Sequence, residues 1–419
     1  MYMKRNFKSF VIISIFLFAA GILASAQTYT WTGGYGNFKN PSNWSPNLPA
    51  GTTPAAFPAG TYKIHSLGPC YLIENITFAG PAQIEVGSEI NDGKFQLANY
   101  TLRGTVTVTV NKKGTLELSG TDEHRNLFSG GKIILKTDST VVYYGNTGKD
   151  IWQGAYQNLI VRGPIQAQSL TVNKTLKIER NPPAENPPIQ ITAPVQTYNG
   201  DVTVLTNTEF RAATSVTFGW SVTAVGRNLS FTGGGAVSMQ GVIAGTVSAA
   251  GTSMLTVNGA VTLSGDLKAK NLTVNTATVT AAKIEVSQAA TVRTAATIAA
   301  PTQTYSGAVT VNADTTFNAS SNLTFGADGT VGGTGSIIVP GNGAVSIQKN
   351  INLTGTASKF EQTGTGAVNI GGNASSITAA TQIYKGAVSV NADTAFEAGT
   401  ALTFESAVFG SLKNIVIKG

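Results

Sequence analysis

Apolar and polar residues alternate with a period of two over long stretches of this chain. Tyr198, Val202 and Phe210 have even numbers, whereas Thr203 and Thr217 have odd numbers. In an extended chain, residues two positions apart lie on the same face. The alternation therefore predicts β-strands with one buried apolar face and one polar outer face.

This pattern belongs to a 28-residue unit that occurs three times without a gap, at residues 191–218, 298–325 and 377–404. Twelve positions are identical in all three copies. The repeat residues on which the interpretation rests are Tyr198, Gly200, Val202, Phe210 and Phe218 in the first copy, Tyr305, Gly307, Val309, Phe317 and Phe325 in the second, and Tyr384, Gly386, Val388, Phe396 and Phe404 in the third. Repetition on this scale is typical of stacked layers that cannot bury their apolar faces alone.

Two all-β architectures fit these patterns. The first is a right-handed parallel β-helix, in which a rung takes roughly 20 to 25 residues, so that the copies lie about five and four rungs apart. The second is a string of small antiparallel β-sandwiches. We favour the β-helix, because no Pro-rich linker separates the copies and the region lacks the buried Trp or Cys pair of many sandwiches.

The start of the chain predicts an export signal at residues 1–26. Lys4, Arg5 and Lys8 precede an apolar run over residues 10–23, and Ala24-Ser25-Ala26 resembles a cleavage site. We therefore expect an exported protein, at the cell surface or outside the cell, with the periplasm as the alternative.

Composition divides the remaining chain into four regions. Residues 27–60 are rich in Pro, Gly and aromatic residues, and residues 61–180 contain short strands and more charge. Residues 181–188 contain four prolines and predict a loop or spacer, because proline cannot join a sheet interior. Residues 189–419 hold the three repeat copies.

Four aromatic residues gather in the first of these regions: Trp31, Tyr35, Phe38 and Trp44. A stack of β layers exposes the apolar end of its first layer, and atypical terminal segments usually cover that end. We interpret residues 27–60 as an N-terminal cap. The alternative is a platform on which sugars stack.

A shorter pattern places an asparagine before an alternating strand. It occurs at Asn75, Asn158, Asn228, Asn271 and Asn414. Asparagine tolerates a left-handed backbone and its amide bonds the chain at turns, so we expect turn elements rather than ligand contacts.

Charge argues against nucleic-acid binding. The formal net charge is +7, and removing the three basic residues of the first 26 leaves 25 basic against 21 acidic residues, a net charge of +4. This excess is small and unclustered. The single cysteine, Cys70, cannot form an internal disulfide, and we expect it to be buried.

Residues with catalytic chemistry are few. The densest group is Asp122-Glu123-His124-Arg125, which we interpret as a solvated turn, and His65 has no second histidine nearby in the sequence. Asp314 and Asp393 occupy matching repeat positions where the first copy has Asn207, which favours turn capping over calcium binding. We predict no catalytic, cofactor or metal site.

The segment from Trp31-Thr32-Gly33-Gly34 to Asn43-Trp44 resembles the opening motif of bacterial surface proteins with autotransporter-like repeats. The segment Gln303-Thr304-Tyr305-Ser306-Gly307-Ala308-Val309 is similar to repeats of filamentous-haemagglutinin-like adhesins of Gram-negative-type bacteria. The resemblance covers most of the chain after the signal. It implies an exported parallel β-helix displayed at the outer membrane, with adhesion as the usual role and no catalytic residues. The chain is short for that family, and no C-terminal membrane barrel is recognised.

The resulting functional expectation is an exported cell-surface protein with a structural or adhesive, non-catalytic role. The alternative is a secreted or periplasmic carbohydrate-active β-helix, such as a polysaccharide lyase or hydrolase. Expected partners are a receptor or glycan on a host or neighbouring cell, the export machinery, and a partner that makes end-to-end contact through the C-terminal layer. Outward hydroxyls such as Thr203, Thr310 and Ser389 suit strands as well as sugars, so they do not identify a ligand.

Overall fold

The computed structural model describes residues 27–419, except residues 67, 99, 120–127, 130–131, 145–148, 152–154, 181–186, 277 and 411–412. The fold is an all-β solenoid with 58% strand and about 16 turns, in which successive coils stack in parallel. This confirms the predicted parallel β-helix, and the parallel pairing excludes antiparallel sandwiches. The described residues divide into two compact units, one within residues 27–117 and 128–139, and the other within residues 118–119 and 140–419.

The first unit is a short solenoid whose first strands differ from the others. Its elements are β1 (Thr28–Trp31), β2 (Gly36–Asn37), the 3-10 turn η1 (Pro41–Asn43), β3 (Trp44–Ser45), β4 (Gly60–Ile64), β5 (Cys70–Tyr71), β6 (Ile76–Thr77), β7 (Ala82–Val86), β8 (Gly93–Ala98), β9 (Leu102–Arg103), β10 (Val106–Val110), β11 (Gly114–Ser119, which continues into the second unit), β12 (Phe128–Ser129) and β13 (Lys132–Leu135). One sheet has the order β13-β10-β7-β4-β1-β3. Its pairs are parallel except β1 with β3, which is antiparallel.

The second unit has three faces, and the chain visits them in a fixed order. The first face comprises β15 (Lys149–Asp150), β17 (Ile165–Gln166), β19 (Ile189–Thr192), β22 (Thr208–Arg211), β24 (Leu229–Thr232), β26 (Val247–Ala249), the first parts of β29 (Asp266–Val274) and β31 (Lys283–Val292), and β33 (Thr302–Tyr305), β36 (Asn322–Phe325), β39 (Ala344–Ile347), β42 (Val368–Ile370), β44 (Val388–Val390) and β46 (Val408–Phe409).

The second face follows the first along the chain. It comprises the first parts of β16 (Ala155–Val161) and β18 (Leu170–Ile178), β20 (Val195–Tyr198), the first parts of β23 (Ser215–Ala224) and β25 (Ala236–Ala244), β27 (Leu255–Val257), the second parts of β29 and β31, β34 (Val309–Val311), β37 (Val331–Gly333), β40 (Ile351–Leu353), the first parts of β43 (Ser376–Tyr384) and β45 (Thr394–Phe404), and β47 (Ile415–Lys418).

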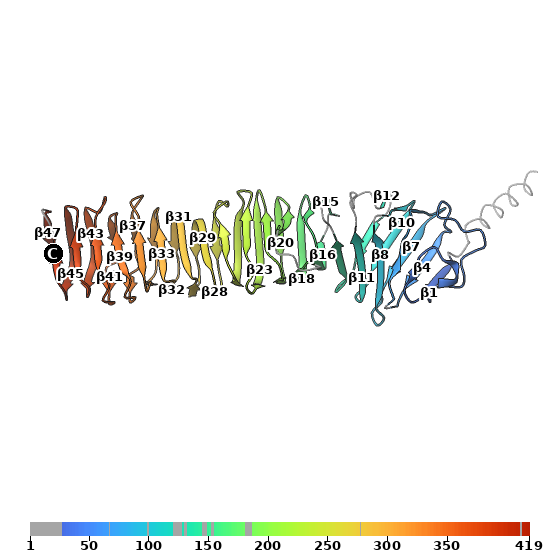
Figure 1. Cartoon of the computed structure of the whole chain (residues 1–419), viewed down its shortest axis with the longest axis horizontal. Helices are drawn as coiled ribbons and strands as arrows, with labels where there is room; N and C mark the ends of the chain where they lie inside the picture. Colours follow the sequence, from blue (N-terminus) through green and yellow to red (C-terminus); the bar gives the residue numbers. More distant parts are fainter. Residues whose placement is uncertain are drawn as a thin grey trace, which may run out of the picture. The chain divides into compact units, whose positions relative to one another are not determined.

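The third face completes each coil. It comprises β14 (Thr140–Tyr144), the second parts of β16, β18, β23, β25, β43 and β45, and β21 (Asp201–Val204), β28 (Val261–Leu263), β30 (Thr278–Thr280), β32 (Ala296–Ala299), β35 (Thr315–Asn318), β38 (Ile337–Val339) and β41 (Lys359–Gln362). Each strand pairs with the strand of the same face in the next coil, and Figure 1 shows these strands following one another from β16 to β47.

The three repeat copies lie on different faces of the second unit. Tyr198 lies in β20 on the second face, Tyr305 in β33 on the first, and Tyr384 in the last part of β43 on the third. The separations between copies are therefore not whole numbers of rungs, contrary to the estimate of about five and four. The repeated unit is a local packing element that can start on any face.

The Pro-rich segment 181–188, of which residues 187 and 188 are described, does not divide the two units. β18 ends before this segment and pairs in parallel with β20 and β21 after it. The solenoid thus continues across the segment, and the division between the compact units lies near residues 118–139.

Candidate functional site

The repeat residues lie inside the solenoid. Tyr198 and Phe218 stack with ring centroids 5.0 Å apart, and Phe210 meets Tyr198 edge-on at 5.9 Å. The same stacked and edge-on pairs recur in the other two copies. Burial raises the pKa of Tyr198, as it does for the matching tyrosines of the other copies, so these phenols stay neutral.

A fully buried glutamine supports each of these aromatic groups. Gln303 donates from Nε2 to the carbonyl oxygens of Ile298 (2.9 Å) and Asn318 (3.1 Å), and its Oε1 accepts from the Tyr305 hydroxyl at 3.1 Å. Gln196 and Gln382 make the equivalent bonds. A buried amide that satisfies backbone carbonyls stabilises the bend of the coil, so this position is structural.

The repeat glycines lie against the preceding coil. A Cβ at Gly200 would come 1.7 Å from the Lys174 carbonyl oxygen, and a Cβ at Gly307 would come 1.3 Å from that of Gln288. Gly386 has the same relation to Gly366, at 1.9 Å. Only glycine fits these positions without a shift of the backbone. Val202, Val309, Val388, Phe317, Phe325 and Phe396 are buried with the tyrosines, whereas Phe404 is half-buried.

The aromatic residues of the N-terminal region differ among themselves. Trp31, Phe38 and Trp44 are buried, and Phe38 meets Trp44 edge-on at 5.0 Å. Tyr35 is 75% exposed and contacts Tyr71. Three of the four side chains therefore cannot offer a ring face to a sugar, while their role as a cap remains a prediction.

The asparagines of the short pattern bond to neighbouring coils. Asn75 Oδ1 accepts from the Thr101 backbone N–H at 2.8 Å, and Asn271 Nδ2 donates to the Ser253 carbonyl oxygen at 2.7 Å. Asn158 Oδ1 accepts from the Thr175 hydroxyl. The backbone N–H groups of Asn228 and Asn414 donate to the side chains of Asn207 and Asp393.

Of the sequence candidates with catalytic chemistry, the structure describes His65 and Cys70. Asp122-Glu123-His124-Arg125 lies outside the described residues. Burial lowers the pKa of His65 although Glu85 opposes the shift, and burial raises the pKa of the Cys70 thiol. Within the described ranges, no three His, Cys, Asp or Glu side chains form a group that could hold a metal ion.

One arrangement on the surface was not foreseen, a row of hydroxyls on the second face. Thr197 pairs with Thr217, which pairs with Ser238, and the row continues through consecutive coils. We call this row the threonine column; its members are Thr171, Thr197, Thr217, Ser238, Thr256, Thr273, Thr291 and Thr310. Seven of these side chains are exposed or half-buried, whereas Thr273 is 4% exposed and donates its hydroxyl to the Met254 sulfur at 3.6 Å. Parallel strands lie about 4.8 Å apart, so eight coils place these side chains along about 34 Å.

The first face of the same coils does not share this composition. Its aligned outward positions are Gln190, Glu209, Ser230, Ser248, Lys268, Glu285 and Thr304. Uniform hydroxyls therefore belong to the second face and are not a general property of outward positions.

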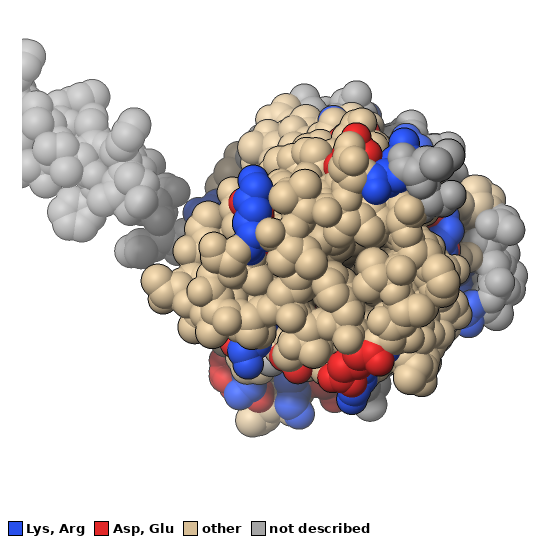
Figure 2. Space-filling model, turned by 90° about the vertical axis from the view of Figure 1, so that its left-hand side faces the viewer, with Lys and Arg blue, Asp and Glu red and all other residues tan. Residues whose placement is uncertain are grey.

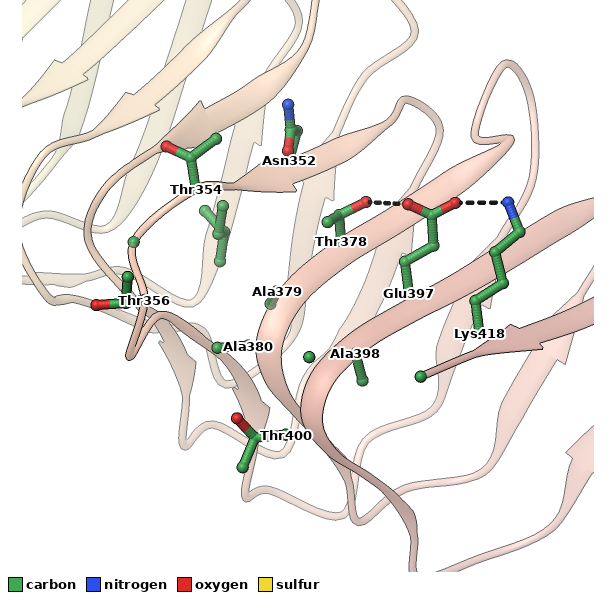
Figure 3. Close-up of a pocket in the computed structure, with 14 residues that line it drawn as sticks. Asn352, Thr354, Thr356, Thr378, Ala379, Ala380, Glu397, Ala398, Thr400 and Lys418 are labelled. Carbon is green, nitrogen blue, oxygen red and sulfur yellow. Dashed lines mark hydrogen bonds and ion pairs between the residues drawn. The ribbon is translucent and has the colours of Figure 1, made fainter.

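Further along the second face a groove of about 720 Å³ opens beside the last strands. Figure 3 shows Thr354 and Thr356 on one side of it, Ala379, Ala380 and Ala398 along its floor, and Glu397 at its rim. Glu397 accepts from the Thr378 hydroxyl at 3.2 Å and pairs with Lys418 at 2.9 Å. The Lys418 hydrogen bond holds the pKa of Glu397 below its usual value, so this carboxylate is unsuited to act as a general acid near neutral pH.

The end of the second unit that carries β47 has an uncharged centre. Figure 2 looks onto this end and shows Lys, Arg, Asp and Glu near its rim. Phe409 is 58% and Ile417 65% exposed. End-to-end contact through this layer remains a prediction.

One buried cation lies between coils. Lys349 is 1% exposed, and its ammonium group donates to the carbonyl oxygens of Asp328 (3.1 Å), Tyr305 (3.4 Å) and Gly307. Burial lowers the pKa of Lys349 to about 8, against an opposing effect of the Asp328 carboxylate. This lysine links coils and has no access to a ligand.

Comparison with known proteins identifies no relative. No family model matches the chain, and neither a curated protein nor a solved structure matches it. None of the helices in the described part of the chain has the length and apolar character needed to cross a membrane.

Proposed function

We propose that this protein is an exported, cell-surface solenoid with a structural or adhesive, non-catalytic role, in which the threonine column contacts an extended partner. The observation that carries the proposal is the row of hydroxyl side chains aligned over eight consecutive coils, and seven of these side chains reach the surface. The repeat residues do not supply this surface, because they are occupied in the interior.

Regular spacing supports adhesion through many weak contacts. Each Thr hydroxyl donates one hydrogen bond and accepts others, and one such bond contributes only about 1 kcal/mol. When one site on a polymer or cell surface is bound, the next is already nearby, so weak contacts add through effective concentration. Affinity therefore grows with the number of coils engaged.

Location and adhesion are tested separately. Protease treatment of intact cells, with lysed cells as the control, should release peptides from residues 189–419 without lysis if the solenoid is displayed outside the cell. Release only after lysis contradicts surface display and favours the periplasmic, carbohydrate-active alternative.

Replacing Asp122, Glu123 and His124 together tests catalysis, because loss of a polysaccharide-degrading activity with folding retained contradicts the non-catalytic role.

Adhesion is tested with a variant that keeps side-chain shape. Purified protein is bound to whole cells, and a triple Thr→Val variant of the column should bind at least about tenfold more weakly, since each lost hydrogen bond is worth about 1 kcal/mol. The column variant carries substitutions at Thr217, Thr256 and Thr291, and the matched control carries them at Thr302, Thr304 and Thr324 on the first face. Equal loss in both variants, or none in the column variant, contradicts a role of the column.

A further inference from the structure

Four bulky apolar side chains are exposed on three consecutive coils of the third face and its edge. Trp220 is 64%, Val225 71%, Ile243 50% and Leu205 48% exposed. They belong to β21, β23 and β25 or directly follow those strands. We call these four residues the tryptophan patch.

Strand register places the patch residues in adjacent coils. Val202 pairs with Val222, so Leu205 and Val225 follow aligned strands at the same edge of the face. Thr223 pairs with Ile243, which places this isoleucine one coil beyond Val225 and two residues closer to the strand centre. Trp220 lies at the opposite end of the same strand, where β23 changes face. The patch therefore extends across the width of one face and over three coils.

Hydroxyl groups lie between the apolar members. Thr203, Thr223 and Ser221 occupy outward positions in the same coils, and Thr262 pairs with Ile243 in the next. Charge is sparse: of the outward positions in these strands, Asp201 alone carries one, and no Lys or Arg lies among them. The surface thus combines one aromatic ring, three aliphatic side chains and several hydroxyls with almost no charge.

The size and chemistry of the patch distinguish between occupants. From the exposed fractions, the four apolar side chains present on the order of 400 Å², which is below the roughly 800 Å² per partner of a stable protein interface. A saccharide has a small cross-section, an apolar face of C–H groups that packs on an aromatic ring, and hydroxyls around its edge. An uncharged saccharide matches the alternation of apolar and hydroxyl groups. A polyanion would face Asp201, and the neighbouring Lys177, which is aligned with Thr203, is already paired with Glu179 at 2.6 Å.

We propose that the tryptophan patch is a binding site for a neutral glycan, with one sugar ring packed on Trp220 and its hydroxyls bonded to Ser221 and Thr223. The site is on a different face from the threonine column and does not depend on the column's role in adhesion. The bound glycan chain would run along β23, from Trp220 towards Val225.

The test uses purified protein and defined oligosaccharides. Neutral hexasaccharides of glucose, mannose, galactose and N-acetylglucosamine are titrated in saturation-transfer NMR and calorimetry, with hexagalacturonate as the charged comparison. At least one neutral hexasaccharide should bind with a Kd below about 10 mM, and Trp220→Ala should weaken this binding at least about tenfold. Ile90→Ala, which removes a side chain that is 77% exposed in the first unit, should leave it unchanged.

Three results would overturn the proposal. The first is that none of the neutral hexasaccharides binds below about 10 mM. The second is that Trp220→Ala binds as well as the wild type while its circular dichroism is unchanged. The third is that sedimentation shows a wild-type dimer that becomes a monomer in Trp220→Ala, which would make the patch an interface between two copies. Because Trp220 is exposed, its replacement does not open a cavity in the core.

Discussion

Replacing Gln303 by leucine tests whether the repeat motif is a structural element. The side chain of Gln303 is fully buried, and leucine has a similar volume. The substitution removes the hydrogen-bond partner of the Tyr305 hydroxyl and one hydrogen bond to each of the Ile298 and Asn318 carbonyl oxygens. The Asn318 oxygen still accepts from the Ala300 backbone N–H at 3.1 Å. A buried polar group that loses its hydrogen bond costs about 1–3 kcal/mol.

One unsatisfied hydroxyl at about 1–3 kcal/mol and two lost hydrogen bonds to carbonyl oxygens at about 0.5–1.5 kcal/mol each suggest a loss of roughly 2–6 kcal/mol, from which about 1–2 kcal/mol of added apolar burial is subtracted. We therefore expect a local loss of about 1–4 kcal/mol in the coils around residues 298–325. Stability in a solenoid is a sum of coil and neighbour terms, so the effect should be largest in these coils and decrease in both directions.

Hydrogen exchange read by mass spectrometry resolves this local effect. Peptides from residues 298–325 should exchange at least about tenfold faster in Gln303→Leu, since 1.4 kcal/mol corresponds to a factor of ten. Gln348→Leu is the matched control, because Gln348 is exposed. A second substitution, Tyr305→Phe, removes the orphaned hydroxyl and should recover part of the loss. Unchanged exchange in Gln303→Leu, or a change no larger than that of the control, would refute the role assigned to the glutamine.

Three further predictions concern single residues in the stack. Gly307→Ala should disrupt the local coils, because the new Cβ would meet a carbonyl oxygen at 1.3 Å, whereas Gly399→Ala, with its nearest atom at 3.9 Å, should leave thermal unfolding unchanged. The pKa of Lys349 is about 8 in the folded state, below its value in the unfolded chain, so between about pH 8 and 10 the unfolded chain binds more protons. The free energy of unfolding should therefore rise with pH over this range, by up to about 1.4 kcal/mol per pH unit. Urea unfolding of Lys349→Met over the same range should lack this slope, and equal slopes would contradict the burial effect. Asp314→Ala should cost about 1 kcal/mol because its Oδ1 accepts from the Ser336 N–H at 3.0 Å, while Asp314→Asn keeps an acceptor and should match the wild type in the same unfolding assay.

The period-two alternation was sufficient to predict β-strands with one buried face, whereas the choice of a parallel β-helix over antiparallel sandwiches needed the uninterrupted repeats as well. It could not place the repeat copies on faces, since the alternation does not say how many residues each corner takes. Aligned members of the threonine column show the difficulty: Thr217 and Ser238 are separated by 21 residues, but Thr256 and Thr273 by 17. Because the corners differ in length, the members of the row are not evenly spaced in the sequence, and the row could not be recognised there.

Trp220 shows how a corner overrides the alternation. Phe218, Trp220 and Val222 all have even numbers, so a straight strand would bury the tryptophan between two core residues. The register shifts between Phe218 and Ser221, where β23 changes face, and this shift puts Trp220 outside while both neighbours remain buried. The alternation of buried even-numbered and exposed odd-numbered residues thus holds within a face and fails at the corners. For this reason the alternation did not predict that Trp220 is exposed.

The placement of the three copies also shows that the repeated unit did not produce the threonine column. Thr217, Thr324 and Thr403 occupy the same position of the repeat, yet they lie on the second, first and third faces. Copying the unit therefore scatters its outward residues around the solenoid and cannot build a row. Ser238, Thr256, Thr273 and Thr291 lie between the first two copies and still continue the threonine column. Most positions that are identical between copies thus pack the interior, and the outward threonine among them does not align from copy to copy. A function carried by this protein's surface has to be sought in rows that cross the coils, because only those rows align side chains that a long partner can meet together.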